Sequence, residues 1–306
     1  TWDFYTIVKG LYHTGEIPWN NIMISGHVMA SKNEKISKRK ENSKNEPSAL
    51  IETYSSDVVR YWTATASLGS DVVFTEEEFK NGRKLVNKLW NAAKFILMHL
   101  QDYNPSNQIS LLPMDQWIIA KFNNMYKHFD DYLEKYEIGL AFNELEKFFW
   151  NFCDNYIEIV KNRLYKPEIY GDDARLSGQT ASYLIMINML KCFAIYFPHI
   201  TEEIYQDFFK RFEKEISIHK LELSEIKYKY AESALADGEE VLEIITAFRK
   251  FKSENNLSLK TELEKVTITA PDLTFIKQAQ ADIASTCSCR EIIYSNDDKV
   301  SAEVNK

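Results

Sequence analysis

The sequence predicts a mainly α-helical protein, in which an antiparallel helical bundle follows the tail of a doubly wound sheet and precedes a small α/β unit. Between residues 75 and 212, four long segments repeat apolar residues at three- and four-residue steps, the pattern of amphipathic helices. Short loops join these segments, as in an antiparallel bundle. Before and after them lie short aromatic or β-branched runs that are typical of strands.

The composition limits the class of protein. The chain has 306 residues, 45% hydrophobic and 27% charged, which suits two or three globular domains. No apolar run approaches the ~18–20 residues that span a membrane, and no signal peptide is recognisable. Because Thr1 already lies in an apolar segment, we expect a fragment of a longer cytoplasmic protein. The net charge of −8 argues against DNA or a membrane as partner, whereas a local basic face can still bind RNA.

The N-terminal segment, 1–30, is predicted to end a sheet. Thr1–Val8 is rich in aromatic and β-branched residues, which indicates a strand or a strand-to-helix turn. Gly15 and Pro18 mark a loop, and the apolar run Ile22–Val28 is predicted to be a buried strand. Two strands cannot form a stable domain alone. We therefore expect them to belong to a doubly wound sheet whose first part is missing.

The helical part begins after a connecting region, 31–74. Ala49–Ala66 has a helical pattern, and Thr75 with Glu78 forms a capping box that opens a helix to about His99. Three further helices complete the predicted bundle, 75–220: Met114–Tyr132, Gly139–Leu164 and Asp172–Phe212, the last interrupted at Pro198. Aromatic stripes at this spacing are first of all core.

Residues 221–306 are predicted to form the small α/β unit. Helical patterns over Asp237–Asn255 and Asp272–Ile283 alternate with strands at Val266–Thr269 and Ile292–Tyr294. We expect the two strands to pair, because a helix can cover one face of them.

The four cysteines carry little functional signal. Cys153 and Cys192 lie singly in helical patterns, where cysteine is usually a small core residue. Cys287 and Cys289 stand one residue apart, too close for the usual zinc spacing, so we expect no metal site. Reduced cysteines are consistent with the cytoplasm.

A basic loop is the strongest functional signal. Ser31–Lys44 contains six lysines and arginines against two glutamates. The loop follows a predicted strand, and the carboxyl ends of strands are where α/β sheets bind phosphorylated ligands. Lysine ammonium groups suit a polyphosphate whose charge shifts during a reaction. The alternative is a solvated charge run. Of the histidines, His13 and His99 are expected to be structural, whereas His27 lies close enough to the loop to support it.

Lys35–Lys40 resembles the Lys-Met-Ser-Lys-Ser signature of class I aminoacyl-tRNA synthetases. In that family the signature follows a Gly-His strand and precedes a proline, a helix and an Asp-x-x-Arg element. The corresponding residues here are Gly26-His27, Pro47, Ala49–Tyr54 and Asp57–Arg60. Two residues depart from the pattern. Arg39 replaces the usual serine, and Glu41 replaces the usual glycine and adds a negative charge beside a phosphate site.

Further strings are similar to those of the valine-specific members of this family: Gly69–Asp71, Asn87–Phe95, Phe149–Glu158 and Phe197–Ile204. The similarity is strong from residue 1 to about 210. It implies the end of a Rossmann-like catalytic domain over 1–30, a signature loop with a stem-contact region over 31–74, and an anticodon-binding bundle over 75–220. An isoleucine-specific enzyme of the same architecture remains an alternative.

The resemblance also implies a reaction for the full-length enzyme. ATP with Mg²⁺ and valine would give valyl-adenylate, and valine would then pass to tRNA(Val). Lys35, Ser37 and Lys38 would be the catalytic residues of the loop, and Lys35, Lys38 and His27 would bind ATP. The family's His-x-Gly-His motif does not occur in these residues. Its adenylate pocket, valine pocket and editing domain are also missing, so we expect no aminoacylation from this fragment alone.

For tRNA, the resemblance points to the first long helix. Lys88, Lys94 and Phe95, with Ile157 on the third helix, occupy positions like the family's anticodon-reading ones. Arg83–Lys94 holds four basic residues and no acidic one, so Lys84 is added as a phosphate contact. An ordinary core role is the alternative for Phe95 and Ile157. Two other functions stay open: a free-standing tRNA-binding module, which an intact signature loop argues against, and a helical interaction protein without RNA.

Overall fold

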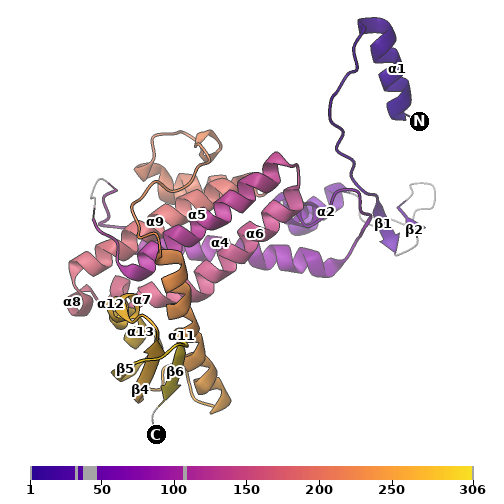
Figure 1. The fold of residues 1–306 in the computed structure, drawn as a ribbon. Coiled ribbons are helices and arrows are strands. Elements are labelled where there is room, and N and C mark those ends of the chain that lie inside the picture. The colour runs from indigo at the N-terminus through magenta and orange to yellow at the C-terminus, as the bar shows by residue number, and fades with distance from the viewer. Residues whose placement is uncertain (1, 32–33, 37–46, 106–108, 305–306) are drawn as a thin grey trace.

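The computed structural model of the chain describes residues 2–31, 34–36, 47–105 and 109–304 (Figure 1). Long helices form the centre of the molecule, and a small sheet lies on either side of them (Figure 1). The predicted class, a helical bundle with small flanking sheets, is therefore confirmed. Among the described residues, none of the helices has the length and apolar character needed to cross a membrane.

The N-terminal segment corrects two predictions. Residues predicted as a strand form helix α1 (Trp2–Thr14), which projects away from the bundle on an extended segment (Figure 1). The predicted strand at Ile22–Val28 is irregular over most of its length, and strand β1 covers only Val28–Ser31. β-branched and aromatic residues form strands only where neighbouring strands satisfy the backbone. No described strand pairs with residues 22–27, whereas α1 satisfies its own backbone.

Strand β1 forms a three-stranded sheet with two very short strands. It pairs antiparallel with β2 (Glu34–Lys35) and parallel with β3 (Val72–Val73). Between them the predicted helix Ala49–Ala66 is in fact two helices, α2 (Pro47–Tyr54) and α3 (Ser56–Ala64). Ser55 separates these helices with a φ of 79°, in the left-handed region. Neither glycine nor proline marks this break, so the apolar period alone could not locate it.

The bundle agrees closely with its prediction. Its main helices are α4 (Glu76–His99), α5 (Pro113–Glu134), α6 (Ile138–Asn151), α7 (Ile157–Tyr165), α9 (Asp172–Ala194) and α10 (Pro198–Ile204). The π-helical turn Phe152–Tyr156 joins α6 to α7, and the short helix α8 (Pro167–Tyr170) follows α7. Beyond α10 the chain continues through a second π-helical turn, Tyr205–Phe209, and two 3₁₀ turns, Lys210–Phe212 and Ile218–Lys220. The predicted aromatic stripes are core: Trp117, Phe142, Phe149 and Phe193 are fully buried.

One detail of the bundle differs from the capping prediction. Thr75 is the N-cap of α4, but its side chain makes no capping hydrogen bond. The three glutamates of the first turn, Glu76–Glu78, already place negative charge at the positive end of the helix dipole. The capping box therefore located the start of the helix without forming the reciprocal hydrogen bonds.

The C-terminal appendage packs a second small sheet against helix α11 (Ala234–Glu254). Strand β4 (Leu263–Ala270) lies between parallel β5 (Cys289–Asn296) and antiparallel β6 (Ser301–Val304). The sequence missed β6 and predicted one helix where there are two, α12 (Thr274–Gln278) and α13 (Gln280–Cys287). The two predicted strands do pair, through the helical crossover that a parallel pair requires.

Helix α11 approaches the bundle closely at one glycine. A Cβ on Gly238 would lie 2.2 Å from the ring of Trp117 in α5, so only glycine fits there. The next residue, Glu239, accepts the indole N–H of Trp117 at 2.9 Å. This contact fixes the appendage against the bundle.

A buried network of charged residues forms a second contact between the bundle and the appendage. Arg163 of α7 is 1% exposed and uses all five of its N–H groups. It donates to both carboxylate oxygens of Asp115 in α5 at 3.0 Å, to both of Asp282 in α13 at 2.7 and 3.2 Å, and to the carbonyl of Ala174 at 2.8 Å. Burial by itself would lower the pKa of Arg163, but the two carboxylates outweigh it and hold that pKa above its ordinary value. Burial raises the pKa of Asp282.

Candidate nucleic-acid interface

The segment that leads into β1 and the basic loop is hydrogen-bonded to residues 69–72. The carbonyls of Ile24 and His27 each accept a backbone N–H, from Gly69 and Val72, at 2.9 Å. The N–H of His27 donates to Oδ1 of Asp71 at 2.8 Å, and His27 Nδ1 lies 3.5 Å from the same oxygen. The hydrogen bond from the His27 N–H lowers the pKa of Asp71. A fixed negative charge therefore stands at the entrance to the loop.

Of the predicted loop residues, Lys35 and His27 are described, whereas Ser37 and Lys38 lie outside the described residues, as do Arg39 and Glu41. Lys35 is exposed in β2, and its charge also contributes to lowering the pKa of Asp71. The structure thus brings Lys35 and His27 together around Asp71. Sequence reasoning quoted Asp71 as part of a family string but gave it no role, because its partner is 44 residues away.

A cavity of about 290 Å³ lies between this segment and the bundle. Its lining includes Gly26 and His27 from the segment before β1, Trp62 from α3 and Ile138 from α6. Gly26 passes very close to the neighbouring chain, because a Cβ there would lie 1.8 Å from the carbonyl oxygen of Ser70. The glycine that precedes His27 therefore serves close backbone packing.

Replacing Gly26 with alanine is expected to weaken the hydrogen bonds that join residues 24–27 to residues 69–72. The new methyl group must displace the backbone at Ser70, and overpacking of this kind costs roughly 1–3 kcal/mol. The amide of Val72, which donates to the His27 carbonyl, should then exchange its hydrogen roughly 5- to 150-fold faster. Ser25→Ala, which removes only a hydroxyl in the same cavity, is the control. An unchanged exchange rate at Val72 in Gly26→Ala would contradict the close-packing role.

The basic residues predicted on α4 divide into two groups. Lys84 and Lys94 are exposed. Lys88 is half-buried, with its Nζ 3.6 Å from a carboxylate oxygen of Asp154 and 6.0 Å from the ring centre of Trp150. Lys84 and Lys94 therefore present free surface to a ligand, while Lys88 must leave Asp154 before it can contact a phosphate.

Phe95 belongs to an aromatic cluster between α4 and α7. The three rings pack edge-on. Their centroids are 4.8 Å apart for Phe95 and His99, 6.1 Å for Phe95 and Tyr165, and 4.4 Å for His99 and Tyr165. Phe95 is half-buried, but Tyr165 is 54% exposed, so one side of the cluster faces solvent. Ile157 begins α7 and Tyr165 ends it, about 12 Å away along the helix. Tyr165, which the sequence did not single out, is therefore the α7 side chain that meets Phe95.

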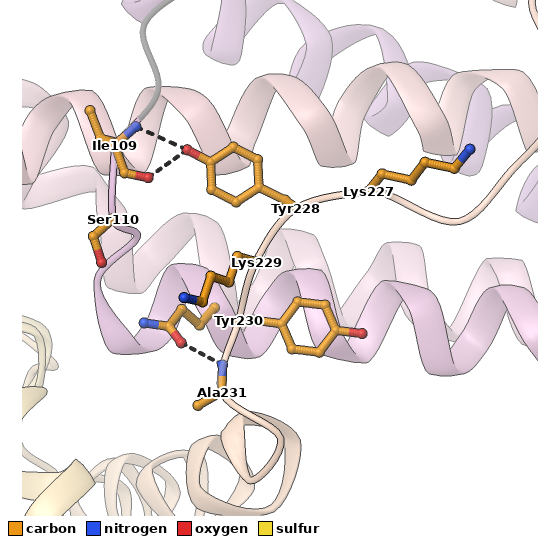
Figure 2. A pocket seen from close by; sticks show the side chains of 8 residues that line it. Ile109, Ser110, Lys227, Tyr228, Lys229, Tyr230 and Ala231 are labelled. Atoms are coloured by element: carbon orange, nitrogen blue, oxygen red, sulfur yellow. Dashed lines mark hydrogen bonds between the residues drawn. The ribbon is translucent and has the colours of Figure 1, made fainter.

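A second basic and aromatic segment, Lys227–Tyr230, lines the cavity of about 700 Å³ in Figure 2. Its aromatic groups are engaged internally. The hydroxyl of Tyr228 donates to the carbonyl of Ile109 at 2.6 Å and accepts its N–H at 3.2 Å (Figure 2). The hydroxyl of Tyr230 accepts the side-chain amide of Asn123 at 3.2 Å. These two tyrosines therefore attach the segment before the appendage to the surface of the bundle.

Known proteins match this chain in two parts. A family described as "Anticodon-binding domain of tRNA ligase" matches residues 115–268, and one described as "tRNA synthetases class I (I, L, M and V)" matches residues 1–75. A protein of Rickettsia felis named Valine--tRNA ligase is 38% identical over 319 residues, covering 99% of this chain and 36% of its own length. The protein of the same name from Rickettsia conorii is 37% identical over 315 residues, covering 99% and 38%. The chain thus spans little more than a third of these relatives.

One solved structure is similar at a greater distance. The Agrobacterium radiobacter K84 LeuRS–tRNA–LeuAMS complex gives a TM-score of 0.49 at 16% identity, over 67% of this chain and 25% of that one.

Proposed function

Because the chain belongs to the tRNA ligases that share this anticodon-binding domain, we propose that it is part of a valine–tRNA ligase of the cytoplasm. The full-length protein would activate valine with ATP and attach it to tRNA(Val). The observation that carries this proposal is the identity of 36–38% to relatives named Valine--tRNA ligase, which extends over 99% of the chain. By itself this chain is expected to bind tRNA without aminoacylating it.

The basic loop would act on the triphosphate of ATP. In phosphoryl chemistry the protein mainly positions the reacting groups and neutralises the charge that develops. Lys35, Ser37 and Lys38 would close on the phosphates, and His27 would support them from its position just before β1. The hydrogen bonds that join residues 24–27 to residues 69–72 favour this role, since a clamp can position a phosphate only if its attachment is held in place.

Magnesium would accompany ATP. Across the described ranges there is no group of three or more His, Cys, Asp or Glu side chains that could hold a metal ion. The carboxylate of Asp71, beside the loop, is already engaged by His27. We therefore assign Mg²⁺ no ligand among the described residues.

The α4 surface would read the anticodon. Lys84 and Lys94 would contact phosphates, and Lys88 would join them after leaving Asp154. Phe95 would stack on an unpaired base, aided by the exposed ring of Tyr165. Ile157, at the other end of α7, would contact a neighbouring nucleotide.

Pyrophosphate exchange with the full-length protein tests the proposal directly. Exchange that depends on valine is expected, with isoleucine much less effective. Isoleucine-dependent exchange at an equal or higher rate would instead support the isoleucine-specific alternative. Filter binding of this chain to tRNA(Val) and to mixed tRNA tests the second half, because a helical interaction protein without RNA would retain neither.

Phe95→Ala separates base recognition from core packing. If Phe95 stacks on a base, its loss should weaken binding of a tRNA(Val) anticodon hairpin by about 1–3 kcal/mol, roughly 5- to 150-fold. The melting temperature should change little, because the ring is only half-buried. Phe122→Ala, at a fully buried ring, is the comparison and should cost about 3–5 kcal/mol of stability. A large stability loss in Phe95→Ala, with unchanged discrimination against an altered anticodon, would mean that Phe95 is core.

A further inference from the structure

A basic cavity of about 530 Å³ lies at the junction of the helical bundle and the appendage. Helices α7 and α8 line one side of it, and α11, the loop at residues 259–260 and the end of α13 line the other. Figure 1 shows these elements gathered where the β4–β6 sheet meets the bundle. No described residue of the basic loop, and none of α4, lines this cavity.

The lining is strongly positive, although the whole chain carries a net charge of −8. One acidic residue, Glu158, opposes five basic ones: Lys161, Lys166, Arg249, Lys252 and Lys260. Lys161 pairs with Glu158 one helical turn away. Among the described lining residues, the remaining four basic side chains therefore have no carboxylate partner, and an anion entering the cavity would be attracted by all of them.

Two of these four basic residues build the cavity. Lys252 is 1% exposed, and its ammonium group donates to the carbonyls of Leu259 at 2.8 Å and Cys287 at 2.7 Å. It thereby ties the loop that carries Lys260 to the end of α13. Arg249 donates to the side-chain oxygen of Asn155 at 2.9 Å, which links α11 to the π-helical turn before α7. The walls of the cavity are therefore fixed by internal hydrogen bonds.

The other two basic residues are available to a ligand. Lys166 and Lys260 are exposed, and neither forms an ion pair with another described residue. They come from opposite walls, Lys166 from the turn between α7 and α8 and Lys260 from the appendage. Tyr170 of α8 and the side-chain amide of Asn162 add polar and aromatic surface between them.

We propose that this cavity binds phosphate groups of an RNA backbone. The proposal rests on the function proposed above, in which α4 and α7 read the anticodon. Tyr165, in ring contact with Phe95, directly precedes Lys166 in the chain. The cavity lining therefore begins one residue along the chain from the proposed stacking site, and we infer that the backbone of a strand bound at Phe95 continues toward Lys166. Basic grooves beside stacking aromatics are the usual arrangement for single-stranded RNA.

The test is the salt dependence of RNA binding by the whole 306-residue chain. The probe is a fluorescent RNA hairpin with the tRNA(Val) anticodon, titrated by anisotropy between about 50 and 200 mM salt. The double variant Lys166→Gln, Lys260→Gln is expected to reduce the log–log salt slope by about 1.4–1.8, the loss of two phosphate contacts. A hairpin with a scrambled anticodon should weaken by the same factor, because phosphate contacts carry no sequence information.

Two further double variants serve as controls for this measurement. Lys214→Gln with Lys220→Gln removes the same charge at two exposed lysines that do not line the cavity, and should keep the wild-type slope. Lys166→Arg with Lys260→Arg conserves the charge and should also keep it. The Gln variant can be compared with wild type only if both are folded, so its melting temperature is measured as well. If that temperature is lower than the wild-type value, the Arg variant separates the two causes. A salt slope that falls in the Gln variant but not in the Arg variant assigns the change to the lost charge.

The outcomes distinguish the two proposals. If the wild-type chain does not bind the hairpin, the proposed function fails. If it binds and the Lys166→Gln, Lys260→Gln variant keeps the wild-type slope, the cavity proposal is overturned while the proposed function stands. Poly-glutamate that binds the cavity as tightly as the hairpin at equal salt would also overturn the assignment to RNA.

Discussion

Replacing Arg163 with methionine is expected to destabilise the chain by about 3–5 kcal/mol. Arg163 is buried between Asp115 and Asp282, and it is the positive charge that both carboxylates contact. Methionine fills much of the volume but leaves two buried carboxylates without their positively charged partner. The hydroxyls of Tyr156, at 2.7 Å, and Ser177 still donate to Asp115, whereas Asp282 loses both of its hydrogen bonds from Arg163.

Urea unfolding monitored by circular dichroism measures this loss. Arg175→Met is the matched control, because Arg175 also forms a two-bond pair, with Asp102, but at the surface. A surface pair is typically worth about 0–1 kcal/mol, so the control should unfold close to wild type. Equal midpoints for Arg163→Met and Arg175→Met would show that the buried network does not hold the appendage to the bundle.

A triple variant tests the explanation. Replacing Arg163, Asp115 and Asp282 together with methionine and leucines removes the charges as a set, so no buried charge is left unpaired. Such replacements often recover the loss from a single substitution. Recovery of most of the lost stability would assign it to unpaired charge, whereas no recovery would assign it to packing or to the hydroxyls of Tyr156 and Ser177, which lose Asp115 as their acceptor.

The second large effect is expected on catalysis. In the full-length protein, Lys38→Ala should slow valine activation by about 10²–10³-fold, or about 3–4 kcal/mol, while leaving valine binding nearly unchanged. Lys38 is the second lysine of the signature and lies outside the described residues. Its charge would meet the pyrophosphate as that group leaves, so its contribution is largest in the transition state.

Pyrophosphate exchange at saturating ATP measures this effect, and the KM for valine serves as the binding readout. Lys44→Ala, in the same basic loop but beyond the signature, is the control and should remain within a few-fold of wild type. A change below tenfold in Lys38→Ala would remove Lys38 from the clamp. Equal losses in both variants would mean that the loop acts only through its total charge.

Much of the fold was predictable because the core-facing side of a bundle helix is marked by apolar residues at helical spacing in the local sequence. The apolar residues of α4, α5 and α6 recur at helical spacing, and the aromatic members Trp117 and Phe142 are fully buried as expected. The family signature was likewise local, since Gly26-His27 and Lys35 lie within one short stretch. Whether Ser37, Lys38 and the α4 residues act as proposed stays a prediction.

The remaining features depended on residues far apart in the chain. The helix α1 and the irregular run at Ile22–Ile24 contradicted local propensity, because a strand requires neighbours that the described residues do not provide. The Arg163 network joins residues 48 and 119 positions apart, and the basic cavity draws its lysines from the bundle and the appendage. Periodicity and motif spacing thus determined the helices, their core faces and the family. Tertiary packing alone decided which charged residues form buried pairs and which line the cavity. Both outcomes depend on distances between residues that are far apart in the sequence.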